Sequence, residues 1–181
     1  LDLSDGNKRI ISYLPICHIF ERAASYYYQY LGYQVYFAES IELLGDNIRE
    51  IKPNFLAVVP RLLEKIFDKI VAKGSTLSGI KKTLFFWAIA LGEAYEPYGK
   101  NGKFYAFKLK IARKLIFSKW QEALGGNLEF MLSGSSPMQD RLIRIFLAAG
   151  IPIFEGYGMT ESSPAITVND LRNKGLKIGT V

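Results

Sequence analysis

Residues 151–164, "IPIFEGYGMTESSP", join an apolar strand pattern to residue types that can hold a phosphorylated ligand. The ring of Tyr157 offers a stacking face for a planar base, and the glycine on either side of it lets a ligand approach the backbone. The Thr160 hydroxyl can contact a phosphate oxygen, and the Glu161 carboxylate is a hard oxygen ligand for Mg²⁺. The pattern therefore favours a nucleotide site.

A second loop of small polar residues, "SGSSP" at 133–137, follows another strand pattern one helix earlier in the chain. The carboxyl ends of parallel strands meet at one edge of a sheet, so Ser135 and Ser136 are expected to lie beside Tyr157. A purely structural explanation is also open, because glycines after strands are usually turns and Thr-Glu can begin a helix as part of an N-cap. Spacing alone does not choose between the two.

Short apolar runs alternate with amphipathic stretches at the start of the chain. The strand patterns are residues 9–15, 33–39 and 54–60. The helix patterns are residues 18–32, 40–52 and 61–74. Helices between short apolar strands predict a mostly parallel sheet with helices on its faces, which is the α/β fold class.

The alternation stops after residue 76 and gives way to two long helical segments separated by "EPYGKNGK", whose proline and glycines enforce a turn. We interpret these segments as a helical hairpin inserted between two runs of βα units. The alternation then resumes with a strand at 128–134, a helix at 138–150 and a strand at 151–158. The predicted organisation is βα units over 1–76, the hairpin over 77–124, and βα units with both polar loops over 125–181.

Composition places the chain among globular proteins, with 49% hydrophobic and 22% charged residues over 181 positions. The single cysteine, Cys17, excludes an internal disulfide framework and favours a reducing, cytoplasmic setting. The longest apolar stretch, at 84–91, is too short to span a bilayer. A net charge of +6 suits an anionic partner such as a nucleotide, a nucleic acid or a lipid headgroup.

The second half of the hairpin is basic and apolar at once. Its cations are Lys100, Lys103, Lys108, Lys110, Arg113, Lys114 and Lys119. Its large apolar residues are Phe104, Phe107, Ile111, Leu115 and Trp120. A basic amphipathic helix can rest on an anionic membrane surface, but apolar residues at this spacing are more often the face packed on the core. We favour packing and keep peripheral membrane contact as the second interpretation.

Several quoted segments resemble one known family. "EGYGMTESSPAITVN" resembles the Tyr-Gly-x-Thr-Glu signature of adenylate-forming, AMP-binding enzymes. "SYLPICHIFER", "VPRLLEKIFDKI", "LSGSSPM" and "KIGTV" are similar, in the same order, to segments of long-chain acyl-CoA synthetases, the long-chain fatty acid:CoA ligases. Five collinear segments are far more specific than one short motif. The resemblance implies that the chain is an internal fragment of the large N-terminal domain of such a ligase.

The resemblance implies an activity with ATP, Mg²⁺ and coenzyme A. A fatty carboxylate attacks the α-phosphate of ATP, which gives an acyl-adenylate and pyrophosphate, and the thiol of coenzyme A then displaces AMP to leave a thioester. It also implies roles for residues of this chain. Catalysis would fall to Thr160 and Glu161, with Glu161 as the metal ligand. Nucleotide binding would fall to Ser135, Ser136, Pro137, Gly156, Tyr157, Gly158, Met159 and Thr160. The acyl pocket would include His18 and Gly134.

His18 and the serine loop call for separate comment. A lone histidine is more often a packed or capping residue, and only the resemblance of the "LPICH" segment places His18 near an acyl group. Many members of the family have Gly-Gly-Ala where this chain has Gly134-Ser135-Ser136, so the contact with the base is expected to differ in detail.

The chain begins at Leu1 without a methionine and ends in "LKIGTV", a string typical of the middle of a strand, so we expect a piece of a longer protein. The family's glycine-rich phosphate loop, its ribose-binding aspartate and its C-terminal catalytic lysine are missing. We therefore expect the 181-residue chain alone to be inactive. Two rival hypotheses are a ligase for an aryl or amino acid, and a non-catalytic module that binds lipid or nucleic acid. The chain shows no RNA-binding aromatic signature and no helix-turn-helix pattern, which counts against nucleic acid.

Overall fold

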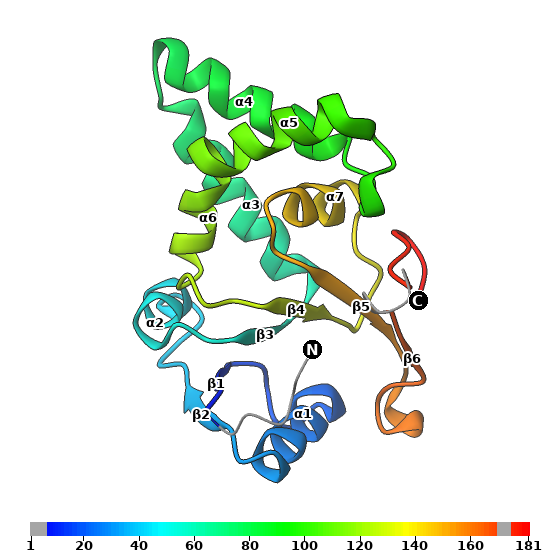
Figure 1. The fold of residues 1–181 in the computed structure, drawn as a ribbon. Coiled ribbons are helices and arrows are strands. Elements are labelled where there is room, and N and C mark those ends of the chain that lie inside the picture. Colours follow the sequence, from blue (N-terminus) through cyan, green and yellow to red (C-terminus); the bar gives the residue numbers. More distant parts are fainter. Residues whose placement is uncertain (1–6, 170–174) are drawn as a thin grey trace.

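The structure is a computed structural model that describes residues 7–169 and 175–181. Its centre is a six-stranded sheet with the order β2-β1-β3-β4-β5-β6, in which β1 to β5 are parallel and β6 is antiparallel to β5 (Figure 1). The strands are β1 (Arg9–Ser12), β2 (Gln34–Phe37), β3 (Phe55–Val58), β4 (Phe130–Ser133), β5 (Ile153–Tyr157) and β6 (Thr167–Val168). The predicted α/β class, with a mostly parallel sheet, is confirmed.

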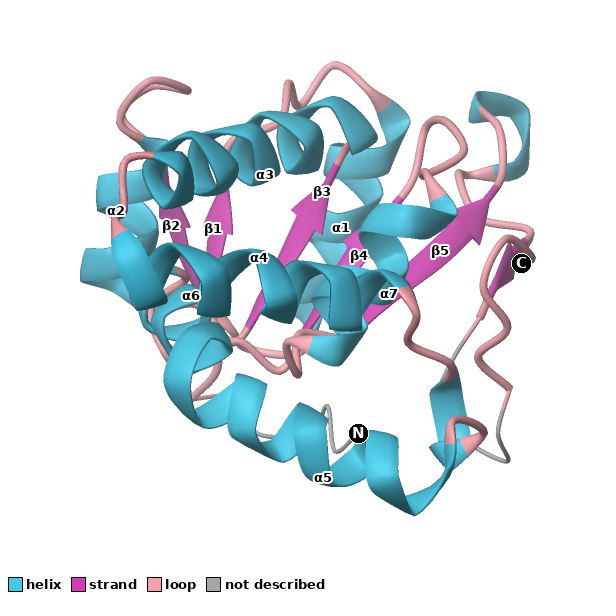
Figure 2. Ribbon diagram, turned by 90° about the horizontal axis from the view of Figure 1, so that it is seen from above, coloured by secondary structure: helices cyan, strands magenta, loops and turns pink. Residues whose placement is uncertain are grey.

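Helices cover both faces of the sheet. Helix α1 lies on one face, and α3 and α7 lie on the other, with α4 and α5 farther out (Figures 1 and 2). The helices are α1 (Ile19–Tyr30), α2 (Leu44–Ile51), α3 (Pro60–Ser75), α4 (Gly79–Glu93), α5 (Gly102–Ala112), α6 (Ser118–Ala123) and α7 (Asp140–Ala148). Among the described residues, no helix combines the length and the apolar character that crossing a bilayer requires.

An aromatic stack fixes the middle of the sheet. The ring of Phe55 on β3 is parallel to that of Phe130 on β4, with centroids 5.1 Å apart, and Phe130 also contacts Phe154 on β5. Strand β3 is buried along its whole length, as expected for a central parallel strand whose residues are apolar on both faces. The stack ties β3 to β4 and β5, the two strands that lead into the polar loops.

The inserted helical unit follows α3. Helix α4 packs on α7, and the chain then turns at Pro97–Gly99 and continues through α5, a π-helical turn at Arg113–Phe117, and α6. The positions of this run that face the core are Leu109, Ala112, Phe117, Trp120 and Leu124. Ala112 and Phe117 are five residues apart, which matches the i→i+5 hydrogen bond of a π-helix. The π segment therefore lets the buried positions before it and after it lie on the same side of the run.

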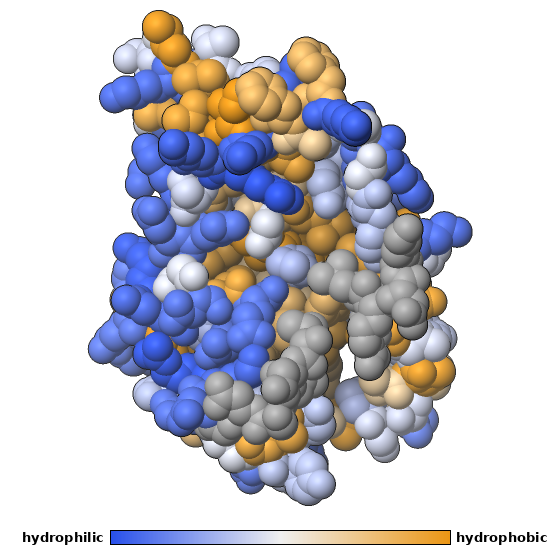
Figure 3. All heavy atoms as spheres, in the orientation of Figure 1, coloured by the Kyte–Doolittle hydropathy of each residue, from blue (hydrophilic) through white to orange (hydrophobic). Residues whose placement is uncertain are grey.

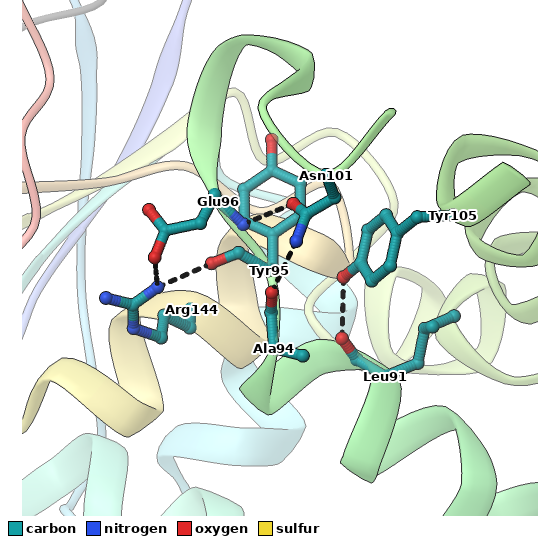
Figure 4. Close-up of polar contacts among 7 residues, drawn as sticks. All are labelled: Leu91, Ala94, Tyr95, Glu96, Asn101, Tyr105 and Arg144. Atoms are coloured by element: carbon teal, nitrogen blue, oxygen red, sulfur yellow. Dashed lines mark hydrogen bonds and ion pairs between the residues drawn. The ribbon is translucent and has the colours of Figure 1, made fainter. Parts of the chain in front are cut away.

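Hydrogen bonds fix the turn between α4 and α5 (Figure 4). Asn101 accepts from the backbone of Glu96 at 2.7 Å and donates to the carbonyl of Ala94 at 2.8 Å. Arg144 of α7 donates to the carbonyl of Tyr95 at 2.8 Å and to the carboxylate of Glu96. These bonds bring one end of α5 against α7 in a single orientation.

Two expectations from the sequence are wrong. We favoured packing for the apolar residues of the hairpin, which is right for Trp120, but the side chains of Phe104, Phe107, Ile111 and Leu115 are exposed because the opposite side of the helix faces the core. The string "LKIGTV" forms a turn rather than a strand. The sheet instead gains the strand β6, whose two residues are too few to give a recognisable strand pattern in the sequence.

A carboxyl group is buried between β1 and α1. The Ser12 hydroxyl of β1 donates to Glu21 of α1, whose side chain is almost wholly removed from solvent. Burial raises the pKa of the Glu21 carboxyl above its ordinary value, and the hydrogen bond from Ser12 opposes the rise only in part. The folded protein therefore holds this proton more tightly than the unfolded chain does.

We predict that Glu21→Gln stabilises the full-length protein, and does so increasingly as the pH rises. A group with a raised folded-state pKa contributes stability at low pH, and that contribution is lost as the pH rises through the folded-state pKa. Glutamine does not ionise and avoids the loss. The melting temperature of the variant, minus that of the wild type, should grow between about pH 5 and about pH 8. Glu50→Gln, at an exposed position of α2, is the charge-matched control. A difference that stays flat would contradict the prediction.

Candidate functional site

Two cavities open at the carboxyl edge of the sheet. The first, which we name the histidine cavity, has a volume of about 280 Å³ and is lined by His18, Phe20, Gly134, Met159 and Thr160 among others. The second, which we name the serine cavity, has a volume of about 410 Å³. It is lined by Ser136, Pro137, Asp140, Glu155 and Thr180 among others. Both volumes suit small molecules or parts of them.

The two cavities share one wall. Ser133, Ser135, Gly156, Tyr157 and Gly158 line both of them, so the end of β5 separates one space from the other. The side chain of Tyr157 is 53% exposed, which leaves its ring free for a ligand to stack upon. The two polar loops, predicted to emerge at the same edge of the sheet, do so.

Most of the predicted site residues line these cavities. His18, Gly134, Met159 and Thr160 face the histidine cavity, and Ser136 and Pro137 face the serine cavity. Glu161 lines neither, because it lies exposed on the short 3₁₀ turn Thr160–Ser162, next to Thr160. Within residues 7–169 and 175–181, no three side chains of His, Cys, Asp or Glu cluster as metal ligands would.

The loop that carries Thr160 is held tightly to its own ends. The hydroxyl of Ser162 accepts from the backbone of Met159 at 3.0 Å, and Ile166 donates to the carbonyl of Tyr157 at 2.9 Å. A Cβ atom built on Gly158 would lie 1.6 Å from the carbonyl oxygen of Pro164. The chain's own return path therefore requires a glycine here. The sequence pattern predicts that a ligand requires this glycine, whereas in the structure the carbonyl of Pro164 is sufficient reason for it.

The serine loop is strained at Ser135, whose φ of 74° lies in the left-handed region that favours glycine. Gly134, beside it, packs on the Phe20 ring of α1, with 3.5 Å between a built Cβ and the ring. Strain of this kind is kept only where the surrounding structure holds it, and it gathers at functional sites. Here it accompanies a residue that lines both cavities.

His18 stands at the entrance to α1. It is the N-cap residue of that helix, but its side chain makes no capping hydrogen bond, and it is exposed rather than packed. The two structural explanations for a lone histidine therefore do not apply to it. His18 instead lines the histidine cavity.

Sequence reasoning missed Ser133 and Glu155, which lie directly opposite each other on β4 and β5. Both are buried, both line the serine cavity, and each has one side-chain oxygen without a hydrogen-bond partner among the described residues. The other oxygen of Glu155 accepts from the backbone of Met138 at 3.4 Å. Burial raises the pKa of the Glu155 carboxyl, the backbone amides of Met138 and Gly179 oppose the rise in part, and the nearby Asp140 adds a smaller contribution to it. An acidic residue within the apolar run "IPIFEG" was the available signal.

In the described part of the chain, the walls of the two cavities carry carboxyl groups but lack cations of the lysine and arginine type. None of the described residues that line either cavity is a lysine or an arginine. The polar groups on offer are hydroxyls, carboxyls and backbone amides. This set can orient a nucleotide, but it brings no positive charge to its phosphates.

The whole chain matches one protein family. The AMP-binding enzyme family matches residues 2–181. This chain belongs to that family. It is 30% identical, over 94% of its own length, to the long-chain-fatty-acid–CoA ligase ACSBG2 of Homo sapiens. It is 36% identical, over 88% of its length, to the peroxisomal long chain acyl-CoA synthetase 6 of Arabidopsis thaliana. It spans about a quarter of these relatives, 27% of the first and 22% of the second.

Solved structures share the fold. A long-chain-fatty-acid–CoA ligase of Archaeoglobus fulgidus aligns with a TM-score of 0.57 at 16% identity, over 92% of this chain and 26% of that one. The A-PCP didomain of a carboxylic acid reductase from Segniliparus rugosus, in complex with AMP, aligns with a TM-score of 0.63 at 19% identity, over 88% and 19%. At such identities the likeness establishes only the fold of this AMP-binding enzyme.

We predict that the two glycines beside Tyr157 respond differently to alanine. Gly158→Ala should lower the free energy of unfolding of the full-length protein by about 1–3 kcal/mol, because the new methyl group overlaps the Pro164 carbonyl. Gly156→Ala should leave it nearly unchanged, because its nearest neighbour would be 3.5 Å away. Urea denaturation of both variants measures the difference. Equal stability of the two would contradict the close approach at Gly158.

Proposed function

We propose that the full-length protein is an ATP- and Mg²⁺-dependent long-chain fatty acid:CoA ligase, and that this chain is an internal part of its N-terminal domain. The family and the names of the relatives support the reaction class. The substrates are a fatty acid, ATP and coenzyme A. The single cysteine, Cys17, is exposed and forms no disulfide, which supports a cytosolic setting.

The observation that carries the proposal is the wall shared by the two cavities. A ligase that joins a carboxylate to a nucleotide must hold two different molecules with their reacting atoms in contact. The serine cavity offers Tyr157 and small polar residues to the adenosine, and the histidine cavity offers His18 and the ring of Phe20 to the acyl group. In this proposal the two substrates approach each other across that wall, at Gly156 and Gly158, which carry no side chains of their own.

The chemistry needs charge stabilisation more than a base. The fatty carboxylate is already ionised at neutral pH, so it attacks the α-phosphate without losing a proton. The attack brings one anion onto another, and donors placed in advance lower that barrier. Thr160, which lines the histidine cavity, holds the α-phosphate in this proposal.

Glu161 fits the role of a magnesium ligand. It is exposed next to Thr160, and Mg²⁺ in phosphoryl-transfer sites takes one or two carboxylates and completes its shell with phosphate oxygens and water. The lack of a three-residue metal cluster in the described part of the chain is compatible with such a site. When bound, the ion neutralises the phosphates.

The base is held by stacking and by one acceptor. The exposed ring of Tyr157 covers the base, with Ser136 and Pro137 along its edge. We assign the Glu155 carboxyl, with its unpartnered oxygen, as the acceptor for the exocyclic amino group of adenine. That pairing would relieve the cost of leaving a buried polar atom unsatisfied.

The first test measures AMP release by the full-length protein with palmitate, acetate and an aryl acid. We expect release with palmitate, dependent on ATP and coenzyme A. Release with the aryl acid alone would replace the long-chain assignment with a ligase for another carboxylate, and release with none would overturn the ligase assignment altogether.

The same assay tests the base contacts when ITP replaces ATP. Hypoxanthine has an oxygen where adenine has an amino group, so the wild type should prefer ATP. Glu155→Ala should reduce that preference by about tenfold, and Glu155→Gln, which keeps an acceptor, should retain most of it. Equal preference in all three proteins would remove Glu155 from the site.

We predict that Thr160→Val and Glu161→Ala each lower the turnover number by roughly 10² or more, because each removes one element of transition-state stabilisation. Valine matches threonine in size, so the loss of activity in Thr160→Val reports the contribution of the hydroxyl.

The isolated 181-residue chain should release no pyrophosphate at all, because its two cavities offer no lysine or arginine to the triphosphate within the described residues. Activity of the isolated chain, or an unimpaired Glu161→Ala variant, would show that the chemistry lies on other residues.

A further inference from the structure

The long helical run after the turn has a second apolar face, directed away from the core. Phe104, Phe107, Ile111 and Leu115 follow one another at steps of three and four residues, which places them along one side of the helix. All four are exposed, Phe104 to 72% and Phe107 to 63%. We call these four side chains the α5 stripe. An exposed apolar row of this kind marks a site of interaction.

The α5 stripe is distinct from the side of the same helical run that packs on the core. Leu109, Ala112 and Phe117 are buried against the rest of the domain. Arg113 donates to the carbonyl of Ala148 at 2.8 Å, and Gln121 donates to the carbonyl of Ala149 at 2.7 Å. Both bonds hold the run on the carboxyl end of α7. The run is therefore docked on its inner side, and the stripe is a separate surface.

Lysines border the α5 stripe on both sides. Helical spacing puts Lys103 and Lys110 along one side of it and Lys108 along the other. Lys108 lies over the ring of Phe104, with its Nζ 4.4 Å from the ring centre. No aspartate or glutamate occurs between residues 97 and 121. Figure 3 shows apolar side chains gathered over α4 and α5, with hydrophilic ones directly beside them.

The orientation of the stripe is fixed by the protein. The network of Figure 4 holds the turn before α5, and the hydroxyl of Tyr105 donates to the carbonyl of Leu91 on α4 at 2.6 Å. The carboxyl ends of the strands, where the cavities open, point away from α5 (Figure 2). A partner on the stripe would therefore leave the cavities open.

We propose that the α5 stripe and its lysines dock on the surface of an anionic lipid bilayer. An apolar row flanked by cations, without acids, matches the two layers of such a surface: acyl chains take the phenylalanines, and headgroup phosphates take the lysines. Nucleic acid fits less well, because Ile111 and Leu115 have no flat face to stack on a base. Burial under another part of the same protein would remove the lysines from water, and none of the described residues forms an ion pair with Lys103, Lys108 or Lys110 that would offset this cost.

The proposal does not depend on the ligase assignment, but the two agree in one respect. Long-chain fatty acids dissolve in bilayers, so a ligase docked on one would work where its substrate is concentrated. The experiment below measures binding to vesicles and uses no activity, so failure of one proposal is distinguishable from failure of the other.

The test is sedimentation of the full-length protein with vesicles of phosphatidylcholine, with and without phosphatidylserine. The wild type should bind the phosphatidylserine vesicles, and binding should weaken as salt screens the lysines. Lys103→Glu with Lys110→Glu should reduce the partition coefficient by at least roughly tenfold. Phe104→Ser with Phe107→Ser should reduce it to a similar extent, because the inserted rings are lost.

The matched control is Lys65→Glu with Lys69→Glu, which changes the net charge equally on exposed positions of α3, away from α5 (Figures 1 and 2). Binding that falls as much in this control would reduce the effect to net charge and overturn the proposal. A phenylalanine variant that melts well below the wild type, with unchanged vesicle binding, would show that the protein's own chain covers the stripe. Loss of a dimer in solution, again with unchanged vesicle binding, would show that a second copy does. Either outcome would overturn it as well.

Discussion

The parallel alignment of β1, β3, β4 and β5 determines where every proposed functional group lies. It sends the ends of these strands to one edge, so that loops distant in sequence line the same two cavities. The stacked rings of Phe55 and Phe130 contribute to that alignment between β3 and β4, and the contact of Phe130 with Phe154 extends it to β5. A slip of one residue between β4 and β5 would turn Ser133 and Glu155 to opposite faces of the sheet and take the shared wall apart.

Much of the fold could be predicted because its signals are local. Apolar runs ended by glycine or proline located the strands and helices, and β3 followed by Pro60 at the first position of α3 is a clear case. Properties that depend on distant neighbours could not be predicted. Leu109 and Phe107 both belong to apolar patterns at helical spacing, but Leu109 is buried and Phe107 is exposed. The sequence does not show which side of the helix packs on the rest of the domain. Likewise, the reason for a glycine at 158 is a carbonyl six residues farther along the chain.

In the described part of the chain, the positive charge is not located at the two cavities. A net charge of +6 suggests an anionic ligand, yet none of the described residues lining the cavities carries a positive charge. The lysines of α5 lie toward the other edge of the sheet (Figure 2). The lysines of α5 are therefore not part of either cavity wall, and the described residues that line the cavities offer hydroxyls, carboxyls and an aromatic ring.

The π-turn at Arg113–Phe117 is a place where the long helical run can lose one residue and keep its core positions. Removing Lys114 would shorten the step between the core positions Ala112 and Phe117 from five residues to four, which an ordinary α-turn accommodates, so Trp120 would keep its place. The same deletion one turn earlier, within α5, would rotate everything before it by about 100° relative to the core. Sequences that differ by one residue here can therefore share one architecture, and length variation among relatives should gather at this turn.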